Sequence, residues 1–123
     1  MTNRMKAKGD RAERAVKDMA AANGFPWCER LKAGDQRDKG DLSLAPGVIA
    51  QVKDRKTLSL RQWLVDTEAQ RVNARADVGV LVVKLASPGK APVWAAVMEL
   101  PGWLSLARQA GWGEPLEQEA DCA

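Results

Sequence analysis

The chain begins with a segment whose apolar positions follow a helical period. Five apolar residues lie on one helical face: Ala12, Ala15, Val16, Met19 and Ala20. Asp10 stands where a helix N-cap belongs, and Gly24 stands where a C′ glycine ends a helix. The pattern therefore predicts a first helix over Arg11–Asn23.

Short stretches rich in apolar residues follow and predict three strands. These strands are expected at Phe25–Leu31, Asp41–Ala45 and Val48–Asp54. A charged loop with two glycines, residues 32–40, separates the first from the second. Pro46-Gly47 joins the second to the third and is typical of a hairpin turn.

The pattern after residue 58 predicts a helix, two strands and a last helix. Ser59 and Gln62 form a capping-box pair that would open a helix over Leu60–Ala76. Val78–Leu85 is almost continuously apolar, which predicts a strand covered on both faces, as in a βαβ crossover. The last elements expected are an edge strand at Pro92–Met98 and a short helix at Pro101–Ala110. This order predicts an α/β fold in which helices pack on a mixed sheet.

Composition places the chain among small globular proteins. Its 123 residues are 46% hydrophobic and 28% charged, which predicts one domain over residues 1–112 and an acidic, flexible tail over 113–123. The chain has no histidine and no tyrosine, which excludes imidazole-based mechanisms and covalent phosphotyrosine chemistry. Cys28 and Cys122 form neither a metal-binding spacing nor a disulfide framework. Without an apolar run of roughly 20 residues or the apolar core of a signal peptide, we expect a cytoplasmic protein that does not cross a membrane.

Charge is divided unevenly between the two halves of the chain. Residues 1–61 hold 14 Lys and Arg against 8 Asp and Glu, a net of +6, whereas residues 62–123 hold 5 against 8, a net of −3. A basic half indicates a polyanionic partner on one side of the molecule.

Three polar residues of the predicted hairpin form the main candidate for chemistry. Gln51 and Lys53 lie two apart on one strand and therefore project from the same face. A two-residue loop would pair Asp41 with Val52, on the opposite face from Lys53. A longer odd-numbered loop, or an equivalent bulge, would pair Asp41 with Lys53 and Ser43 with Gln51. We expect the second arrangement, because Pro46-Gly47-Val48 can supply it.

This cluster suits hydrolysis of a phosphodiester. Mg²⁺ prefers carboxylate, carbonyl and water oxygens, which Asp41, the Gln51 amide and the Val52 carbonyl can provide. Lys53 can orient or deprotonate water and stabilise charge at phosphorus. Glu13, at the edge of the first helix's apolar face, is the candidate for a second carboxylate. The ordinary alternatives are a loop-end aspartate, a solvated strand face, and a glutamate that completes a capping box with Asp10.

Taken together, these residues resemble the PD-(D/E)xK nuclease superfamily. The resemblance rests on Lys8-Gly9 ahead of Glu13, on Gly24-Phe25, on Asp41 and on Gln51-Val52-Lys53. It covers about residues 8–85 and is greatest to archaeal-type and phage-type Holliday junction resolvases. It implies a restriction-endonuclease-like fold with an αβββαβ core, to which this chain adds a C-terminal strand and helix.

The resemblance also implies an activity and roles for individual residues. Glu13, Asp41 and Gln51, with the Val52 carbonyl, would bind Mg²⁺ or Mn²⁺, and Lys53 would assist the attacking water. Gln51 stands where the family carries an acid, as in Mrr-type restriction nucleases. The residues expected to grip DNA are Lys8, Arg30, Lys32, Arg37, Lys39, Arg55 and Lys56.

The expected protein is a homodimeric, Mg²⁺-dependent endonuclease acting on branched DNA during recombination or repair, in a bacterium or a phage-infected bacterium. Two alternatives within DNA biology stay open: a restriction-like or repair nuclease with another DNA substrate, and a non-catalytic DNA-binding protein on the same fold. A structural domain that binds no nucleic acid is a third.

Overall fold

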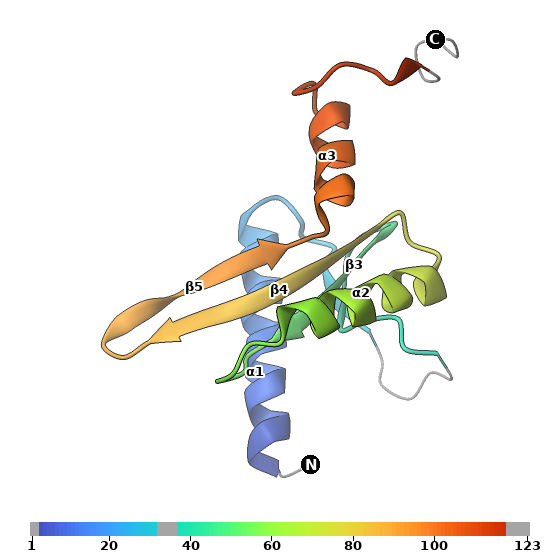
Figure 1. Ribbon diagram of the computed structural model, residues 1–123. Helices are drawn as coiled ribbons and strands as arrows, with labels where there is room; N and C mark the ends of the chain where they lie inside the picture. Colours follow the sequence, from blue (N-terminus) through green and yellow to red (C-terminus); the bar gives the residue numbers. More distant parts are fainter. Residues whose placement is uncertain (1–2, 32–36, 118–123) are drawn as a thin grey trace.

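A five-stranded mixed sheet forms the centre of the protein, with helices on both of its faces (Figure 1). The structure, a computed structural model, describes residues 3–31 and 37–117. The elements in chain order are α1 (Asn3–Ala22), β1 (Glu29–Arg30), β2 (Leu42–Ala45), β3 (Val48–Lys53), α2 (Leu60–Ala74), β4 (Val78–Ser87), β5 (Lys90–Val97) and α3 (Leu100–Gln109). The predicted α/β class with a mixed sheet is confirmed.

The strands lie in the sheet in the order in which they occur along the chain, from β1 to β5. Neighbouring strands are antiparallel except β3 and β4, which are parallel and are connected through α2. This is the βαβ crossover that the apolar run beginning at Val78 predicted.

The two faces of the sheet carry separate apolar clusters. On one face, α1 packs Ala12 and Val16 against a cluster that includes Leu42, Ala50 and Val52. On the other face, Trp63 of α2 packs against Leu81 and Val83 of β4. Figure 1 accordingly shows α1 behind the sheet and α2 in front of it. β4 is therefore covered on both faces along its first half, as expected, although Leu85 and the residues after it are exposed.

The first helix begins eight residues earlier than predicted. α1 starts at Asn3 and includes Asp10, so the interpretation of Asp10 as an N-cap is wrong. The end of the helix was predicted correctly. Gly24 has a φ of +98°, and the N–H of Phe25 donates to the Ala20 carbonyl at 2.8 Å, as in a Schellman motif.

The first strand is much shorter than the predicted Phe25–Leu31. Only Glu29–Arg30 pairs with β2, because the preceding residues form a turn in which the Cys28 N–H donates to the Phe25 carbonyl at 3.2 Å. The Phe25 and Trp27 rings lie edge to face, 6.2 Å apart.

The hairpin between β2 and β3 combines a two-residue turn with an irregularity in β2. Ala45 pairs with Val48 across Pro46-Gly47, whose glycine has a φ of +83°, and Ser43 pairs with Ile49. Leu44 is thus the extra residue of a bulge. The predicted register, which pairs Asp41 with Lys53 and Ser43 with Gln51, is wrong by two residues, because the extra residue lies in β2 and not in the loop. A shift of two residues keeps the same side chains on the same face.

The helix α2 starts where it was predicted, but not by the predicted cap. The side chain of Ser59 makes no capping hydrogen bond, and the Gln62 amide donates to Asp66 at 2.9 Å instead. The capping-box prediction is therefore wrong. The helix ends at Ala74, two residues early, because Arg75 adopts a left-handed conformation with a φ of 53°.

The last two elements lie within a few residues of their predicted bounds, at Lys90–Val97 and Leu100–Gln109. The predicted tail is exposed over residues 113–117, and the remainder of it lies outside the described residues. Within residues 3–31 and 37–117, none of the helices combines the length and the apolar character that a membrane span requires.

Candidate active site

A cavity of about 460 Å³ opens where the N-terminal half of α1 passes the start of β2 and the end of β3. Its lining includes every residue that the sequence proposed for metal binding or catalysis: Glu13, Asp41, Gln51, Val52 and Lys53. Three separate stretches of chain thus contribute to one hollow. The remaining lining residues are Met5, Lys6, Lys8, Gly9, Asp10, Asp54, Arg55 and Lys56.

Asp41 is fixed to both of its neighbouring strands. Its N–H donates to the Ala50 carbonyl at 2.9 Å, and its own carbonyl accepts the Leu31 N–H at 2.9 Å. Its carboxylate oxygen Oδ2 accepts the N–H of Val52 at 2.8 Å. Burial raises the pKa of the Asp41 carboxyl above its ordinary value, an effect partly offset by the Val52 N–H and by the charge of Lys53.

Gln51 contributes a buried amide oxygen without a partner. Its side chain is only 8% exposed, and its Oε1 accepts no hydrogen bond. Such an atom costs about 1–3 kcal/mol unless a donor, a water or a cation meets it. The Val52 N–H points toward β2, and the carbonyl of a strand residue points the same way as its N–H. Asp41, Gln51 and Val52 all line the same cavity.

Lys53 lies at the end of β3 with its ammonium over an aromatic ring. Its Nζ is 5.7 Å from the centroid of the Trp63 ring on α2. A cation over an indole face is attracted by the ring quadrupole, so the contact restricts where the ammonium can lie.

Glu13 reaches the cavity from α1 and is paired with a cation. Arg30 of β1 donates to Glu13 through Nε at 3.0 Å and to Asp10 through an NH₂ group at 2.7 Å. Burial raises the pKa of Glu13, the charge of Asp41 raises it further, and Arg30 opposes both effects. Glu13 and Asp10 are one turn apart on α1, so both carboxylates lie on the side of the helix that faces β1.

The segment before Asp41 is anchored to α2 by a set of polar contacts. The Gln70 amide donates to an Asp38 carboxylate oxygen, and the Asn73 amide donates to the Asp38 carbonyl, both at 2.8 Å. The other Asp38 carboxylate oxygen accepts the Gly40 N–H at 3.0 Å. Gly40 itself has a φ of +98° and lies so close to the Ala50 carbonyl that a Cβ would be 3.1 Å from its oxygen. These contacts set the position of Asp41.

The residues proposed to contact DNA fall into three groups. Lys8, Arg55 and Lys56 line the cavity and also a second hollow of about 400 Å³, which extends along β4 past Lys84. Arg30 is engaged by Glu13 and Asp10, as described above. Arg37 and Lys39 are exposed and do not line the cavity, and Lys32 lies outside the described residues.

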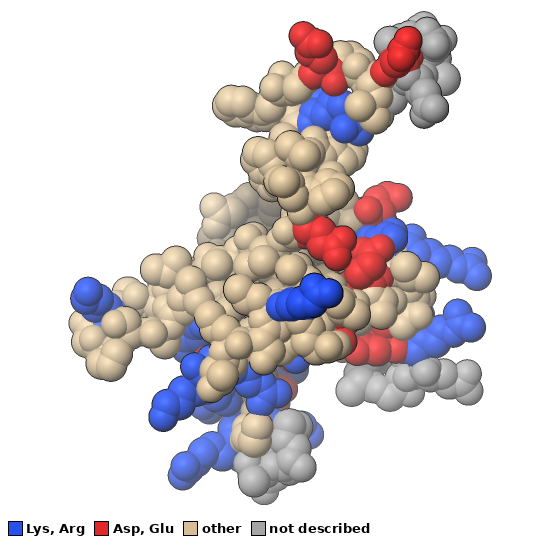
Figure 2. Space-filling model, viewed as in Figure 1, with Lys and Arg blue, Asp and Glu red and all other residues tan. Residues whose placement is uncertain are grey.

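Positive charge gathers around this end of the molecule. Figure 2 shows many of the Lys and Arg side chains over its lower part, around the N-terminal half of α1 and below the β4–β5 hairpin, whereas acidic side chains lie nearer to α3. The uneven charge of the two chain halves thus becomes an uneven distribution in space.

Two acidic residues at the cavity were not anticipated. Asp10 was assigned to a cap, and Asp54 was treated as the end of a strand. Asp54 lies 3.6 Å from the ammonium groups of both Lys8 and Lys84.

The sequence does contain a signal for the longer α1, because Met5 continues the helical spacing of Ala12 and Val16 toward the N-terminus.

The cavity's oxygen donors suit a hard divalent cation. They comprise the carboxylates of Asp41 and Glu13, the partnerless Gln51 amide oxygen and the Val52 carbonyl, all of which Mg²⁺ and Mn²⁺ accept. Among residues 3–31 and 37–117, no three Asp, Glu or Cys side chains are grouped closely enough to form a metal site without neutral oxygens. A cation here would therefore depend on the amide and carbonyl oxygens of β3.

Comparison of the chain with protein-family models, with curated proteins and with solved structures found no match.

Proposed function

We propose that this protein is a Mg²⁺-dependent endodeoxyribonuclease with a restriction-endonuclease-like fold. One observation carries the proposal: Glu13, Asp41, Gln51, Val52 and Lys53, from three separate stretches of chain, line a single cavity. The order of elements, from the first helix through the hairpin to the βαβ crossover, also matches what the sequence resemblance implies. Mn²⁺ is expected to substitute for Mg²⁺, because both accept the same oxygen ligands.

The residues of the cavity divide the chemistry between them. Asp41, Glu13, Gln51 and the Val52 carbonyl would hold a divalent cation, which would supply neutralising charge at phosphorus and make a nearby water more acidic. Lys53, held over the Trp63 ring, presents an ammonium that hydrogen-bonds the scissile phosphate or orients the attacking water. The hydrogen bond from Val52 aims the Asp41 carboxylate before substrate arrives.

DNA is the proposed substrate because the cavity continues into a basic surface. Lys8, Arg55 and Lys56 lie in both the cavity and the adjoining hollow, so a phosphate backbone could follow them into the site. Branched DNA, in particular a four-way junction, is the substrate that the sequence resemblance favours. A cytoplasmic enzyme of a bacterium or its phage, acting as a homodimer, completes the proposal.

The direct test is a cleavage assay on three substrates, namely a four-way junction, supercoiled plasmid and single-stranded DNA, with a matched linear duplex as the comparison for the junction. We expect nicking in Mg²⁺ or Mn²⁺, no nicking in EDTA, and loss of nicking in Asp41→Asn. Nicking of the junction but not of matched linear duplex would support branched DNA as the substrate. Wild-type protein that cuts none of the substrates with either metal, or Asp41→Asn protein that cuts as well as wild type, would contradict the proposal.

A non-catalytic DNA-binding protein is the second candidate, and Gln51 is the observation that favours it. A glutamine in place of an acid leaves the cavity with one fewer negative charge to hold a cation. This candidate predicts DNA binding that weakens as salt rises, with no metal-dependent cleavage of any of the three substrates.

A further inference from the structure

The hairpin formed by β4 and β5 projects beyond the rest of the sheet. β3 pairs with β4 only as far as Lys53 opposite Val83, whereas β4 continues to Ser87 and pairs there with β5 alone. The four residues of β4 past Val83 span about 13 Å at roughly 3.3 Å per residue. Figure 1 shows this part of the hairpin extending past α1. We call residues 84–93 the ribbon.

The outer part of the ribbon is exposed and partly apolar. Every residue from 85 to 93 is exposed. Leu85 and Val93 lie opposite each other on the two strands, and they are 40% and 61% exposed. A two-stranded hairpin alone is at best marginally stable in water, and an exposed apolar pair does not stabilise it by burial. The ribbon therefore has the form of a contact surface.

Positive charge lies along the ribbon. Residues 78–98 contain Lys84 and Lys90 but no Asp or Glu. Lys84, at the base of the ribbon, lies 3.6 Å from Asp54, and Asp54 lies at the same distance from Lys8. One carboxylate thus faces two ammonium groups, so the base of the ribbon keeps a positive excess. Lys90, near the tip, is exposed.

The hollow of about 400 Å³ connects the ribbon to the candidate active site. Leu85 and Ala86 line it from the ribbon. Arg55 and Lys56 line both this hollow and the cavity that contains the proposed catalytic residues. Both side chains are exposed, and no carboxylate within residues 3–31 and 37–117 forms an ion pair with either of them or with Lys90. A basic surface therefore runs from the cavity to the ribbon.

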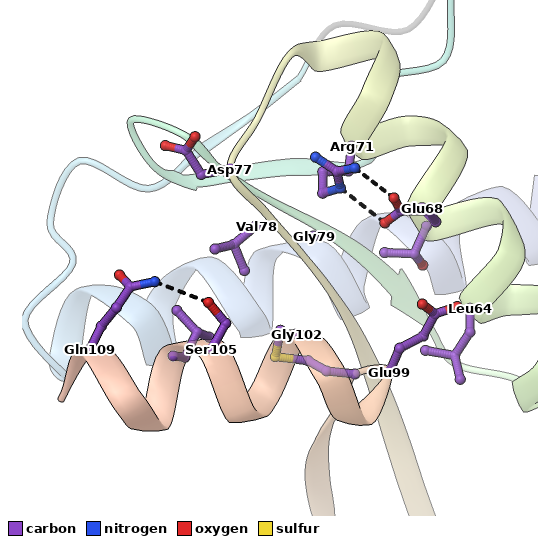
Figure 3. Close-up of a pocket in the computed structure, with 13 residues that line it drawn as sticks. Leu64, Glu68, Arg71, Asp77, Val78, Gly79, Glu99, Gly102, Ser105 and Gln109 are labelled. Carbon is purple, nitrogen blue, oxygen red and sulfur yellow. Dashed lines mark hydrogen bonds and ion pairs between the residues drawn. The ribbon is translucent and has the colours of Figure 1, made fainter. Parts of the chain in front are cut away.

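The other end of β4 has the opposite charge. A hollow of about 580 Å³ lies there between α2 and α3, next to Val78. Its acidic residues are Glu68, Asp77 and Glu99, and Figure 3 shows them around the hollow. Arg71 also lines it and is bound to Glu68 at 2.6 Å. Three acids against one arginine repel a polyanion, so an anionic partner is favoured at the ribbon end of β4.

We propose that the ribbon enters the major groove of a DNA duplex whose phosphodiester lies in the candidate active site, an inference that rests on the proposed function. The major groove of B-DNA is about 12 Å wide and admits a two-stranded β-ribbon. The ribbon's reach of about 13 Å past β3 corresponds to about four base pairs along the duplex. Lys90 then binds a phosphate at the edge of the groove, and Leu85 and Val93 supply apolar contacts of the kind made with thymine methyl groups.

A DNA groove fits the ribbon better than a strand of another protein does. β5 is an edge strand of the sheet, and an exposed edge can pair with a further strand. Pro92 has no N–H to offer such a strand, and Lys90 adds charge to the same edge. The edge is thus protected against strand pairing, whereas the exposed side chains of the ribbon are open to a groove.

Blocking the major groove tests the proposal. Two duplexes of the same sequence are compared, one with cytosine and one with glucosylated 5-hydroxymethylcytosine, whose sugar lies in the major groove. We expect wild-type protein in EDTA to bind the modified duplex at least about tenfold more weakly, as for the loss of a base contact. A variant in which Asn-Gly replaces residues 86–92 joins Leu85 to Val93 through a two-residue turn. It should bind both duplexes equally. Equal binding of the two duplexes by wild type, or undiminished discrimination by the shortened variant, would overturn the proposal.

Lys90→Met tests the tip without changing the length of the ribbon. It should lower the slope of log Kd against log salt concentration by about 0.9, the contribution of one phosphate contact. Arg75→Met is the matched control, because Arg75 is exposed just before β4 and thus at the other end of that strand. It should leave the slope unchanged. A Lys90→Met slope equal to that of wild type would contradict the contact at the tip and overturn the proposal.

The ribbon contact and the nuclease activity can fail separately, because binding in EDTA involves no cleavage. Protein that cuts DNA in Mg²⁺ but binds both duplexes equally would refute the ribbon contact and leave the nuclease intact. Protein that discriminates between the duplexes but cuts no DNA would support the ribbon contact and refute the nuclease.

Discussion

The carboxylate of Asp41 is hydrogen-bonded to the backbone N–H of Val52 at 2.8 Å. The bond crosses from the start of β2 to β3 and joins the first polar residue of the hairpin to the centre of the Gln51-Val52-Lys53 segment. The bond holds the Asp41 carboxylate next to Val52, whose backbone carbonyl is a candidate ligand for the metal ion. The same carboxylate thus has two roles: it accepts a backbone hydrogen bond, and it is a proposed ligand of the metal ion.

Replacing Asp41 by Asn separates these two roles. The amide oxygen of Asn can still accept the Val52 N–H, so we expect the variant to fold and to unfold at the same temperature or slightly higher without metal. The charge that binds the cation is lost, and cleavage should fall by at least about 100-fold, the scale for removing one electrostatic group from an active site. Cleavage rates and thermal unfolding with and without Mg²⁺ measure both effects. A variant whose melting temperature still rises with Mg²⁺ as in wild type would remove Asp41 from the ligand set.

Lys53 and Lys84 offer a matched pair of lysines. Lys53 Nζ lies 5.7 Å from the centroid of Trp63, and Lys84 Nζ lies 5.8 Å from that of Trp94. Substitution of either by Met removes a cation–π contact of about 0.5–1 kcal/mol. Lys84→Met also removes an ion pair with Asp54, so it should lose at least as much stability as Lys53→Met. Only Lys53→Met should lose cleavage, while its affinity for DNA stays close to that of wild type. Equal losses of turnover in the two variants would show that Lys53 has no special role.

Gln51 can be tested in two directions. Its Oε1 is buried without a partner, so Gln51→Met should raise the metal-free free energy of unfolding by about 1 kcal/mol while lowering cleavage. Gln51→Glu should do the reverse: the metal-free protein is less stable because a buried charge lies near Asp41, and Mg²⁺ binds more tightly. Calorimetric Mg²⁺ titration and urea unfolding measure the changes. Unchanged Mg²⁺ affinity in Gln51→Glu would argue against Gln51 as a ligand.

The order of elements followed from local pattern, and so did the cluster around Lys53. Apolar periodicity and the Pro46-Gly47 turn are local signals, so they predicted the hairpin, the crossover and the face shared by Gln51 and Lys53. The position of the bulge at Leu44 was not predictable, because two registers that differ by two residues place the same side chains on the same face.

The contacts between residues that are far apart in the sequence could not be predicted from it either. Arg30 binds Glu13 and Asp10 across 17 and 20 residues, and Asp38 meets Gln70 across 32 residues. Such pairs depend on the packing angle of α1 and α2, which periodicity does not give. The N-cap interpretation of Asp10 failed for a related reason: an Asp inside a helix resembles a cap when the preceding turn is polar.

The two raised carboxyl pKa values predict how stability depends on pH. Burial raises the pKa of Asp41 above 3.8 and that of Glu13 above 4.5, their ordinary values. The folded state therefore binds these protons more tightly than the unfolded state. Stability of the metal-free protein should fall as pH rises from these ordinary values through the raised ones, and should then be constant.

The double variant Glu13→Gln with Asp41→Asn isolates this contribution from the other carboxyls. The difference in free energy of unfolding between wild type and this variant should grow, to the disadvantage of wild type, as pH increases through that window. Mg²⁺ affinity of wild type should rise over the same window, because protons compete with the cation. A difference that does not change with pH would show that the two carboxyls titrate alike in the folded and unfolded chain.

Arg30 is expected to weaken binding of the cation at Glu13 rather than to contact DNA. Its guanidinium is shared between Glu13 and Asp10, so its charge is already compensated. Arg30→Met should reduce metal-free stability by less than about 1 kcal/mol, as for other partly exposed ion pairs. It should increase Mg²⁺ affinity, because a cation no longer competes with an arginine for Glu13.

Lys56→Met supplies the comparison for DNA binding. Lys56 is exposed at the cavity rim, so its loss should weaken binding to DNA of any sequence. The slope of log Kd against log salt concentration should fall by about the amount that one phosphate contact contributes. Arg30→Met should leave that slope almost unchanged. Titration of labelled duplex at several salt concentrations measures both slopes. A loss of slope in Arg30→Met equal to that in Lys56→Met would mean that Arg30 leaves its two carboxylates to bind a phosphate when DNA arrives.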